Sequence, residues 1–146
     1  MNGQTPRRTR RQPLPPLPAV TEDNREFWDG CRRHELRIQR CGSCGTTRFP
    51  PRPACPRCGS LAVVWMTCAG RGEVYSFTVV HPPTLPAFAS QVPYVAGLVR
   101  LCEGVLMVGQ IRGRAPAEVS IGMPVAVEFD DMTSEISLPH WRVPAP

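Results

Sequence analysis

The spacing of apolar residues in the first part of the chain predicts one short helix followed by one strand. We expect the helix to begin at Thr21, which is suited to the N-cap, and to run to about residue 33, with an apolar stripe on one face. The stripe consists of Phe27, Trp28 and Cys31. Apolar and polar residues then alternate through 35–40, which is the pattern of a strand.

From Gly70 onward the chain changes to short segments rich in β-branched and aromatic residues, separated by glycine and proline. Strands are expected at 72–81, 94–101, 105–111, 125–129 and 136–143. Residues 102–104 have the composition of a hairpin turn, whereas the proline-rich segment 81–93 is expected to be a loop. Five short strands favour a closed, five-stranded barrel of the OB type over a flat sheet, whose edges would need covering.

Between these two regions, two C-x-x-C pairs lie close together, each followed by glycine. The four residues are Cys41, Cys44, Cys55 and Cys58. Two such turns facing each other present four thiolates in a tetrahedron, which is the geometry that Zn²⁺ prefers. Iron in the same cage is the alternative metal. Because four thiolates close the coordination sphere, whereas a catalytic zinc keeps one position open, the pattern predicts a structural zinc ribbon.

The other three cysteines, Cys31, Cys68 and Cys102, belong to no motif, and we expect each to be a small buried apolar side chain. A disulfide framework would require an oxidising compartment, and no secretory signal supports one. Without an apolar run of about eighteen residues, no membrane span is expected. These features together favour a reduced, cytoplasmic protein.

The net charge of +5 is unevenly distributed along the 146 residues. Residues 1–20 carry four arginines and many prolines without any acidic residue, and we expect this leader to be disordered. Residues 41–70 carry three arginines and no acidic residue, whereas residues 71–146 have five arginines against seven acidic residues. The basic charge therefore lies on the leader and the ribbon, and the barrel is mildly acidic.

Several motifs occur in a fixed order that resembles the DUF35 family. They are Phe27-Trp28, Leu36-x-Ile38-Gln39, the two cysteine pairs, Phe49-Pro-Pro-Arg52, Gly70-Arg-Gly72, Pro93-Tyr94 and Ile121-Gly-Met-Pro-Val125. The cysteines alone are common to many ribbons, and it is the segment 49–52 and the Gly-Arg-Gly motif that make the resemblance specific. The resemblance covers about 21–143. It implies a mainly β protein with an N-terminal helical segment at 21–40, a rubredoxin-like zinc ribbon at 41–68 and an OB-fold domain at 69–146.

The resemblance also implies a role as an accessory subunit of a thiolase-like enzyme, such as a thiolase, an acyltransferase or a steroid side-chain aldolase. The partner would supply the catalytic residues, and this chain would help to form the channel for acyl-CoA. Coenzyme A requires cations for its phosphates and an apolar wall for its arm. The candidate residues for binding the acyl-CoA thioester are Phe27, Trp28, Arg48, Arg52, Arg57 and Tyr94. Each is equally compatible with a place in the core or in solvent.

Two other classes of function remain open from the residues. Zinc ribbons and OB folds both occur in proteins that bind single-stranded nucleic acid, but an acidic barrel disfavours that function here. An independent enzyme would need a catalytic group, and the chain has no local Ser-His-Asp or Cys-His pattern. The candidate histidines are His34, His81 and His140, and His81 is the candidate for a catalytic residue that acts on a substrate held by the partner.

Overall fold

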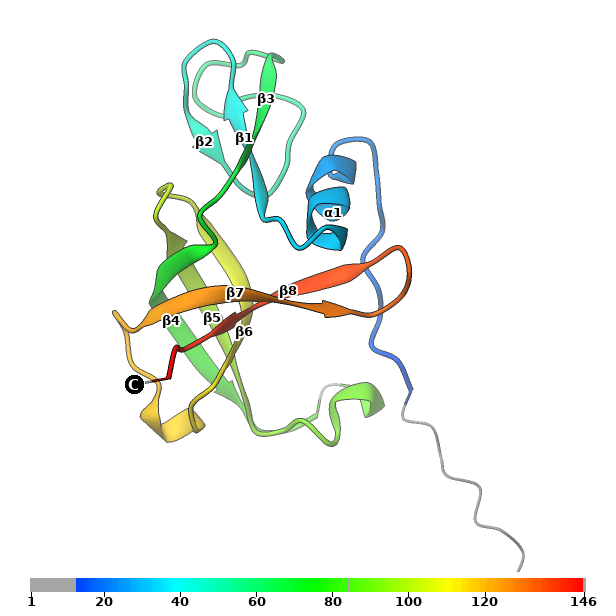
Figure 1. Ribbon diagram of the computed structural model, residues 1–146, viewed down its shortest axis with the longest axis vertical. Helices are drawn as coiled ribbons and strands as arrows, with labels where there is room; N and C mark the ends of the chain where they lie inside the picture. The colour runs from blue at the N-terminus through cyan, green and yellow to red at the C-terminus, as the bar shows by residue number, and fades with distance from the viewer. Residues whose placement is uncertain (1–12, 84, 146) are drawn as a thin grey trace, which may run out of the picture.

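The computed structural model describes residues 13–83 and 85–145. A helix and a small three-stranded sheet lie at one end of the molecule, and a five-stranded barrel lies at the other (Figure 1). This mainly β architecture, with one helix at the N-terminus, agrees with the fold class expected from the sequence. Most of the predicted leader lies outside the described residues.

The helix α1 spans Arg25–Arg32 and is shorter than predicted. Its N-cap is Asn24, and the prediction that Thr21 caps the helix is therefore wrong. The Asn24 side chain accepts a hydrogen bond from the backbone N–H of Thr21 at 2.7 Å and donates one to the carbonyl of Ala19 at 3.1 Å. These bonds close a turn before the helix, because asparagine binds neighbouring backbone readily. The turn occupies the residues that the helix was expected to include.

The three-stranded sheet has the order β2-β1-β3 and carries the two C-x-x-C turns. Its strands are β1 (Arg37–Cys41), β2 (Thr47–Arg48) and β3 (Val63–Thr67). Both neighbours pair with β1 in antiparallel register. Leu36 and Ile38 are buried and join the core beneath α1, which explains the alternation seen in the sequence.

The five remaining strands form a closed barrel in the order β4-β5-β6-β8-β7, as expected. They are β4 (Arg71–Val80), β5 (Tyr94–Leu101), β6 (Leu106–Arg112), β7 (Pro124–Asp131) and β8 (Ser137–Arg142). All pairs are antiparallel except β6 with β8, which are parallel through Ile111 and Trp141. This single parallel contact closes the barrel and removes the exposed strand edges. Trp141, Met107 and Val99 fill the interior.

Two single 3₁₀ turns interrupt the connections of the barrel: η1 (Pro86–Phe88) and η2 (Pro116–Glu118). The first lies in the proline-rich loop after β4, where no regular structure was expected. A proline at its start suits a 3₁₀ turn, since the missing N–H would have no partner there. None of the helices in the described part of the chain is long and apolar enough to cross a membrane.

The hairpin turn between β5 and β6 joins the ribbon to the barrel. The Glu103 carboxylate accepts a hydrogen bond from the backbone N–H of Ala69 at 2.7 Å, and its carbonyl accepts one from the Thr47 hydroxyl at 3.1 Å. These hydrogen bonds tie the ribbon to the barrel through the hairpin turn that the sequence predicted at 102–104.

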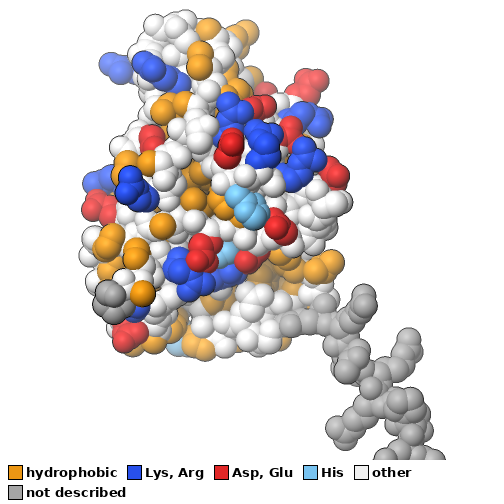
Figure 2. All heavy atoms as spheres, in the orientation of Figure 1, with side chains coloured by type: hydrophobic (Ala, Val, Ile, Leu, Met, Phe, Trp, Pro, Cys, Tyr) orange, Lys and Arg blue, Asp and Glu red, His pale blue; other side chains and the backbone are white. Residues whose placement is uncertain are grey.

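Figure 2 shows basic and acidic side chains intermixed over α1 and strands β7 and β8 on the face in view.

Candidate functional site

The four motif cysteines converge at the tip of the three-stranded sheet, with all four sulfur atoms within 4.8 Å of one another. The Sγ atoms of Cys41 and Cys58 are 3.6 Å apart, and those of Cys44 and Cys55 are 3.7 Å apart. Four sulfurs at 2.3 Å from a tetrahedral zinc lie about 3.8 Å from one another. The cysteines are therefore positioned for metal binding, as the sequence predicted.

Each C-x-x-C turn depends on the glycine that follows it. Gly45 and Gly59 both have φ of 73°, which a residue with a Cβ rarely adopts. The N–H of Gly45 donates to the carbonyl of Cys41 at 3.0 Å, and the N–H of Gly59 donates to that of Cys55 at 2.8 Å. The two turns thus share one backbone conformation, which brings each pair of sulfurs to the same side.

Backbone N–H groups point at one sulfur of the cluster. The N–H of Ser43 and that of Cys44 lie 3.4 Å and 3.5 Å from Cys41 Sγ. The N–H of Cys44, followed by that of Ser43, lowers the pKa of Cys41 to about 6, because a hydrogen bond to the thiolate stabilises its charge. The Thr46 hydroxyl likewise holds the pKa of Cys44 below its ordinary value. These donors favour the thiolate form that a metal requires.

A metal in this cage would be held by four cysteine side chains with no position for a substrate. Bound zinc would supply a cross-link between the two turns, and the residues present would do no chemistry through it. Within 13–83 and 85–145, this is the one group of three or more His, Cys, Asp or Glu side chains arranged to hold a metal ion. The arrangement fits a structural zinc ribbon.

Two of the three remaining cysteines are buried, as predicted, and the third is not. Burial raises the pKa of Cys31 and that of Cys68 to about 12, with the Glu103 charge adding to the effect at Cys68. Both thiols are therefore inert. Cys102 is exposed, contrary to the prediction, because it lies in the hairpin turn after β5 rather than within a strand.

Arg48 is placed inside the ribbon and not on its surface. Its guanidinium is part of a side chain only 5 % exposed, and its Nε donates to Gln39 Oε1 at 2.7 Å. The same oxygen accepts the backbone N–H of Arg52 at 2.9 Å. Gln39 and Arg48 therefore fix the connector between the two cysteine pairs. This arrangement explains why Gln39 and the Phe49–Arg52 segment occur together in the sequence.

The arginines predicted to contact phosphate divide into exposed and buried side chains. Arg52 and Arg57 are exposed on the ribbon, the second of them between Cys55 and Cys58. Arg48 is engaged with Gln39 and with the carbonyl of Arg52 at 3.1 Å, which favours a structural role. Of the three arginines predicted to contact phosphate, Arg52 and Arg57 are therefore the two available to an anion.

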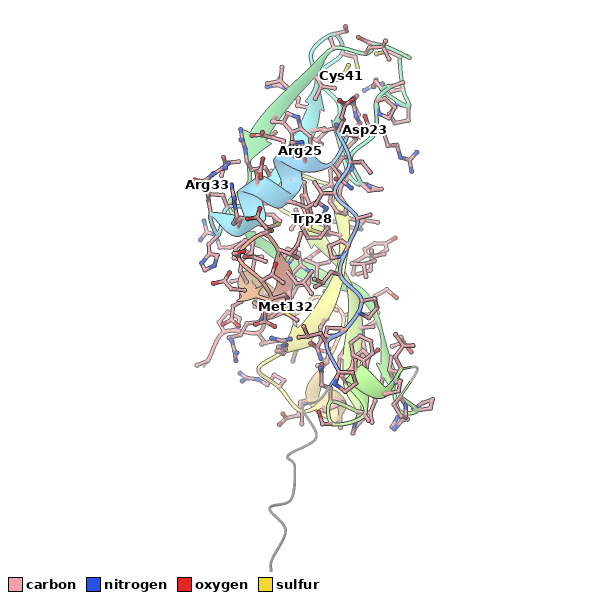
Figure 3. The ribbon with its side chains drawn as sticks, turned by 90° about the vertical axis from the view of Figure 1, so that its right-hand side faces the viewer. Asp23, Arg25, Trp28, Arg33, Cys41 and Met132 are labelled. Atoms are coloured by element: carbon pink, nitrogen blue, oxygen red, sulfur yellow. The ribbon has the colours of Figure 1, made fainter. Side chains whose placement is uncertain are left out.

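The predicted aromatic residues Phe27 and Trp28 line a cavity of about 380 Å³ between α1 and the barrel. Phe27 packs edge-on against Trp28 at 4.9 Å between ring centroids and against Phe49 of the ribbon at 5.3 Å. Figure 3 shows Trp28 on α1, on the side that faces the barrel. Phe88 from η1 forms another part of the wall, and no local pattern in the sequence indicates that it lies near the helix.

The other two predicted residues lie further along the barrel. Tyr94, at the start of β5, packs against Phe88 at 6.1 Å between centroids and so borders the cavity without lining it. His81 is exposed directly after β4, in the proline-rich loop. A catalytic role for His81 stays a prediction.

The sequence indicated His140 only as one of three candidate histidines and not its place: it lines the same cavity and is 4 % exposed. The alternation of β8 places His140 on the outer face of the barrel, where a side chain is ordinarily solvated. Helix α1 packs against β8 and covers that face. No local sequence signal indicates this burial, because it depends on a helix more than a hundred residues away.

The barrel aromatics do not form an open stacking platform. The Arg100 guanidinium lies over the Tyr75 ring at 4.6 Å and also pairs with Glu73 at 3.6 Å. Phe129 is stacked on His34 at 5.2 Å between ring centroids. Tyr75 therefore lies beside a basic residue, but Glu73 pairs with that residue and balances its charge. The arrangement gives no support to a nucleic-acid interface.

Two family models match adjoining parts of the chain. The rubredoxin-like zinc ribbon domain of ChsH2 matches residues 28–64, and the C-terminal OB-fold domain of ChsH2 matches residues 65–130. The matched regions contain the four cysteines and the first four strands of the barrel. Both agree with the fold described above.

Curated relatives fall into two groups. A probable enoyl-CoA hydratase alpha subunit of Thermomonospora curvata is 42 % identical over 91 % of this chain, and a 3-oxo-4,17-pregnadiene-20-carboxyl-CoA hydratase alpha subunit of Mycobacterium tuberculosis is 43 % identical over 86 %. The chain spans only 41 % and 38 % of these two proteins. A DUF35 domain-containing scaffold protein of Pyrococcus furiosus is 36 % identical, and the match covers 62 % of this chain and 71 % of that protein.

Among solved structures, the Ltp2-ChsH2(DUF35) aldolase contains a chain that is 42 % identical, with a TM-score of 0.79. The match covers 87 % of this chain and 98 % of that one. A DUF35 protein of unknown function from Sulfolobus solfataricus is 16 % identical, with a TM-score of 0.59 over 84 % of this chain and 86 % of that one, and shares the fold.

Proposed function

The chain belongs to the DUF35 family, and on this premise we propose that it is a non-catalytic accessory subunit that binds acyl-CoA and associates with a thiolase-like enzyme. One observation carries the proposal: the similar chain in the structure named as an aldolase is matched over 98 % of its length. Relatives named as scaffold proteins and as alpha subunits of hydratases support a role within a larger assembly.

The geometry of the metal centre supports the non-catalytic part of the proposal. Four thiolates leave no position for a substrate, and the cage lies at the tip of the ribbon. The thiols of Cys31 and Cys68 are inert. A partner would therefore supply the catalytic groups, and this chain would supply surface and stability.

The ribbon and the cavity together offer what coenzyme A thioesters need. Arg52 and Arg57 are exposed cations, and guanidinium groups suit phosphate oxygens. The aromatic wall formed by Phe27, Trp28 and Phe49 is apolar and lies at the junction of the ribbon with the barrel. In this proposal the phosphates contact the ribbon, and the acyl end extends toward the barrel.

The proposal is tested by producing the chain together with a candidate thiolase-like protein from the same organism. We expect the two proteins to co-purify, and we expect the partner to lose most of its turnover of acyl-CoA thioesters when this chain is omitted. The measurement is the rate of thioester cleavage, with and without the chain, at equal partner concentration. Equal activity and equal thermal stability of the partner in both preparations would contradict the proposal.

Replacing both ribbon arginines, Arg52→Ala with Arg57→Ala, is expected to weaken binding of the CoA thioester by about tenfold, because two charge-assisted contacts to phosphate are lost. The measurement is the Kd of the assembled complex at fixed salt concentration. The control pair, Arg71→Ala with Arg114→Ala, removes the same charge from the barrel and should change the Kd by less than about twofold. Equal weakening by both pairs would show a general charge effect and no phosphate site on the ribbon.

A further inference from the structure

The cavity between α1 and the barrel has a polar end as well as an aromatic wall. Phe27, Trp28 and Phe88 form the apolar part, and Met132, just after β7, lies opposite Trp28 (Figure 3). At about 380 Å³ its volume is at the lower end of the range typical of small-molecule sites. The cavity is therefore large enough to receive a small organic group.

Three side chains from adjacent strands form the polar end. Arg112 Nη1 lies 2.9 Å from His140 Nε2 and 2.8 Å from Asp130 Oδ2. His140 Nε2 also faces the Glu128 carboxylate at 3.2 Å, so it lies between a donor and an acceptor. Nδ1 is buried without a hydrogen-bond partner, 3.6 Å from Asp130 Oδ2. A buried polar atom without a hydrogen-bond partner costs free energy, and a ligand that hydrogen-bonds to it would remove that cost.

The formal charges around this polar end cancel. Glu128 pairs with Arg142 and also lies 3.2 Å from His140 Nε2, while Asp130 pairs with Arg112. Two acidic groups therefore balance two arginines around the histidine. Such an end offers hydrogen-bond donors and acceptors without net attraction for an anion or a cation. It suits a hydroxyl or a carbonyl better than a carboxylate.

The proline-rich segment before α1 closes one side of the cavity. Pro15 and Pro16 contribute to its wall, and the segment runs down past Trp28 and Met132 (Figure 3). Within the described part of the chain, the hydrogen bonds nearest to it are those of Asn24 with Ala19 and Thr21. Pro15 and Pro16 have no backbone N–H to donate, so they hold this wall less firmly than other residues would, which favours opening and gives a ligand a route of entry.

We propose that this cavity binds a neutral, largely apolar organic group that carries one hydroxyl or carbonyl, with the proline-rich segment as its movable wall. The shape favours a small molecule over a protein surface, because the site is concave. An acyl group has this chemistry, so the identity of the natural ligand rests on the proposed function. Binding by the isolated chain does not, and it is tested separately.

The test compares octan-1-ol with octanoate, which share an alkyl chain and differ in charge. We expect saturable, sub-millimolar binding of octan-1-ol to the full chain, and binding of octanoate at least tenfold weaker, because burying a carboxylate beside a neutral cluster is costly. Calorimetry gives both Kd values. The indole N–H signal of Trp28 in an NMR titration reports whether binding occurs in the cavity.

Two matched variants on the outer face of β6 locate the site. Val108→Trp places an indole at the mouth of the cavity and should weaken octan-1-ol binding at least tenfold. Val108 is 71 % exposed, so the change should leave the fold intact. Leu106→Trp, two residues earlier and 37 % exposed, lies outside the cavity lining and should leave the Kd within twofold.

The outcomes separate this inference from the proposed function. Equal weakening by both variants, or octanoate binding as tightly as octan-1-ol, would overturn it. So would absent octan-1-ol binding combined with loss of partner co-purification in Val108→Trp, which would assign the cavity to a partner side chain. Normal octan-1-ol binding by a chain that neither associates with nor activates a thiolase-like enzyme would leave the inference standing and reject the proposed function.

Discussion

Replacing Cys55 by serine is expected to abolish metal binding and to unfold the ribbon. Cys55 is buried, and its sulfur lies 3.7 Å from that of Cys44 within the four-sulfur cluster. A serine hydroxyl does not replace a thiolate as a zinc ligand, and structural zinc supplies much of the folding free energy of such small modules. The expected loss is more than about 4 kcal/mol in the free energy of unfolding.

The measurements are the zinc content per chain by elemental analysis and the unfolding transition followed by circular dichroism. Cys102→Ser is the matched control, because Cys102 is exposed and lies outside the cluster, so zinc content and stability should not change. A Cys55→Ser chain that still holds one zinc with normal stability would contradict the structural assignment. Iron in place of zinc in the wild-type chain would leave the role of the cage unchanged but correct the metal.

Chelation of the wild-type metal should have the same consequence as the substitution. Because the cage has no open position, chelators are expected to abolish partner activity only in parallel with unfolding of the ribbon and loss of assembly. Loss of turnover in a complex that remains folded and assembled would instead show that the metal takes part in catalysis.

Replacing Gly72 by alanine is expected to open the barrel. Gly72 lies in β4 between two partner strands, opposite Leu101 of β5 and Val125 of β7. A Cβ on Gly72 would come 2.2 Å from the carbonyl oxygen of Arg100, which is backbone and has no room to move aside. Relief of the clash would require separation of β4 from β5, at a cost of about 3 kcal/mol or more.

The control for Gly72→Ala is Gly104→Ala in the hairpin turn. Gly104 has φ of 85°, and a Cβ there would meet nothing within 4 Å. Its replacement should cost only about 1–2 kcal/mol, from the left-handed backbone. Urea unfolding followed by the fluorescence of the barrel tryptophan, Trp141, measures both. A Gly72 variant no less stable than the Gly104 variant would show that the strands can separate cheaply at this point.

The glycine result also explains a motif that the sequence showed without a reason. Gly70 has φ of 68°, and a Cβ there would come 2.7 Å from Val127 Cγ1, while Gly72 faces the backbone of β5. Both positions of the Gly-Arg-Gly motif are thus required by close approach at the point where the barrel begins. The arginine between them is exposed and serves neither purpose.

Errors in the sequence analysis have a common origin in competition between local interactions. Thr21 and Asn24 are both good N-caps, and the Asn24 side chain decides the start of α1 by binding the backbone before it. Cys102 was expected to be buried on composition alone, but a hairpin turn places it in solvent. In both cases the residue type was compatible with two environments, and a neighbouring contact selected one.

The sequence by itself determined the metal ligands and the strand pattern. Each cysteine pair and its glycine act within five residues, so local turn geometry suffices to aim the sulfurs, and alternation along a strand reports its two faces directly. Only the tertiary structure decided that Arg48 is buried with its guanidinium hydrogen-bonded to Gln39. The same holds for His140, which lines one cavity together with Phe27 and Phe88. These placements depend on which surfaces pack together, between two paired strands for Arg48 and across more than a hundred residues for His140, and no local pattern encodes that choice.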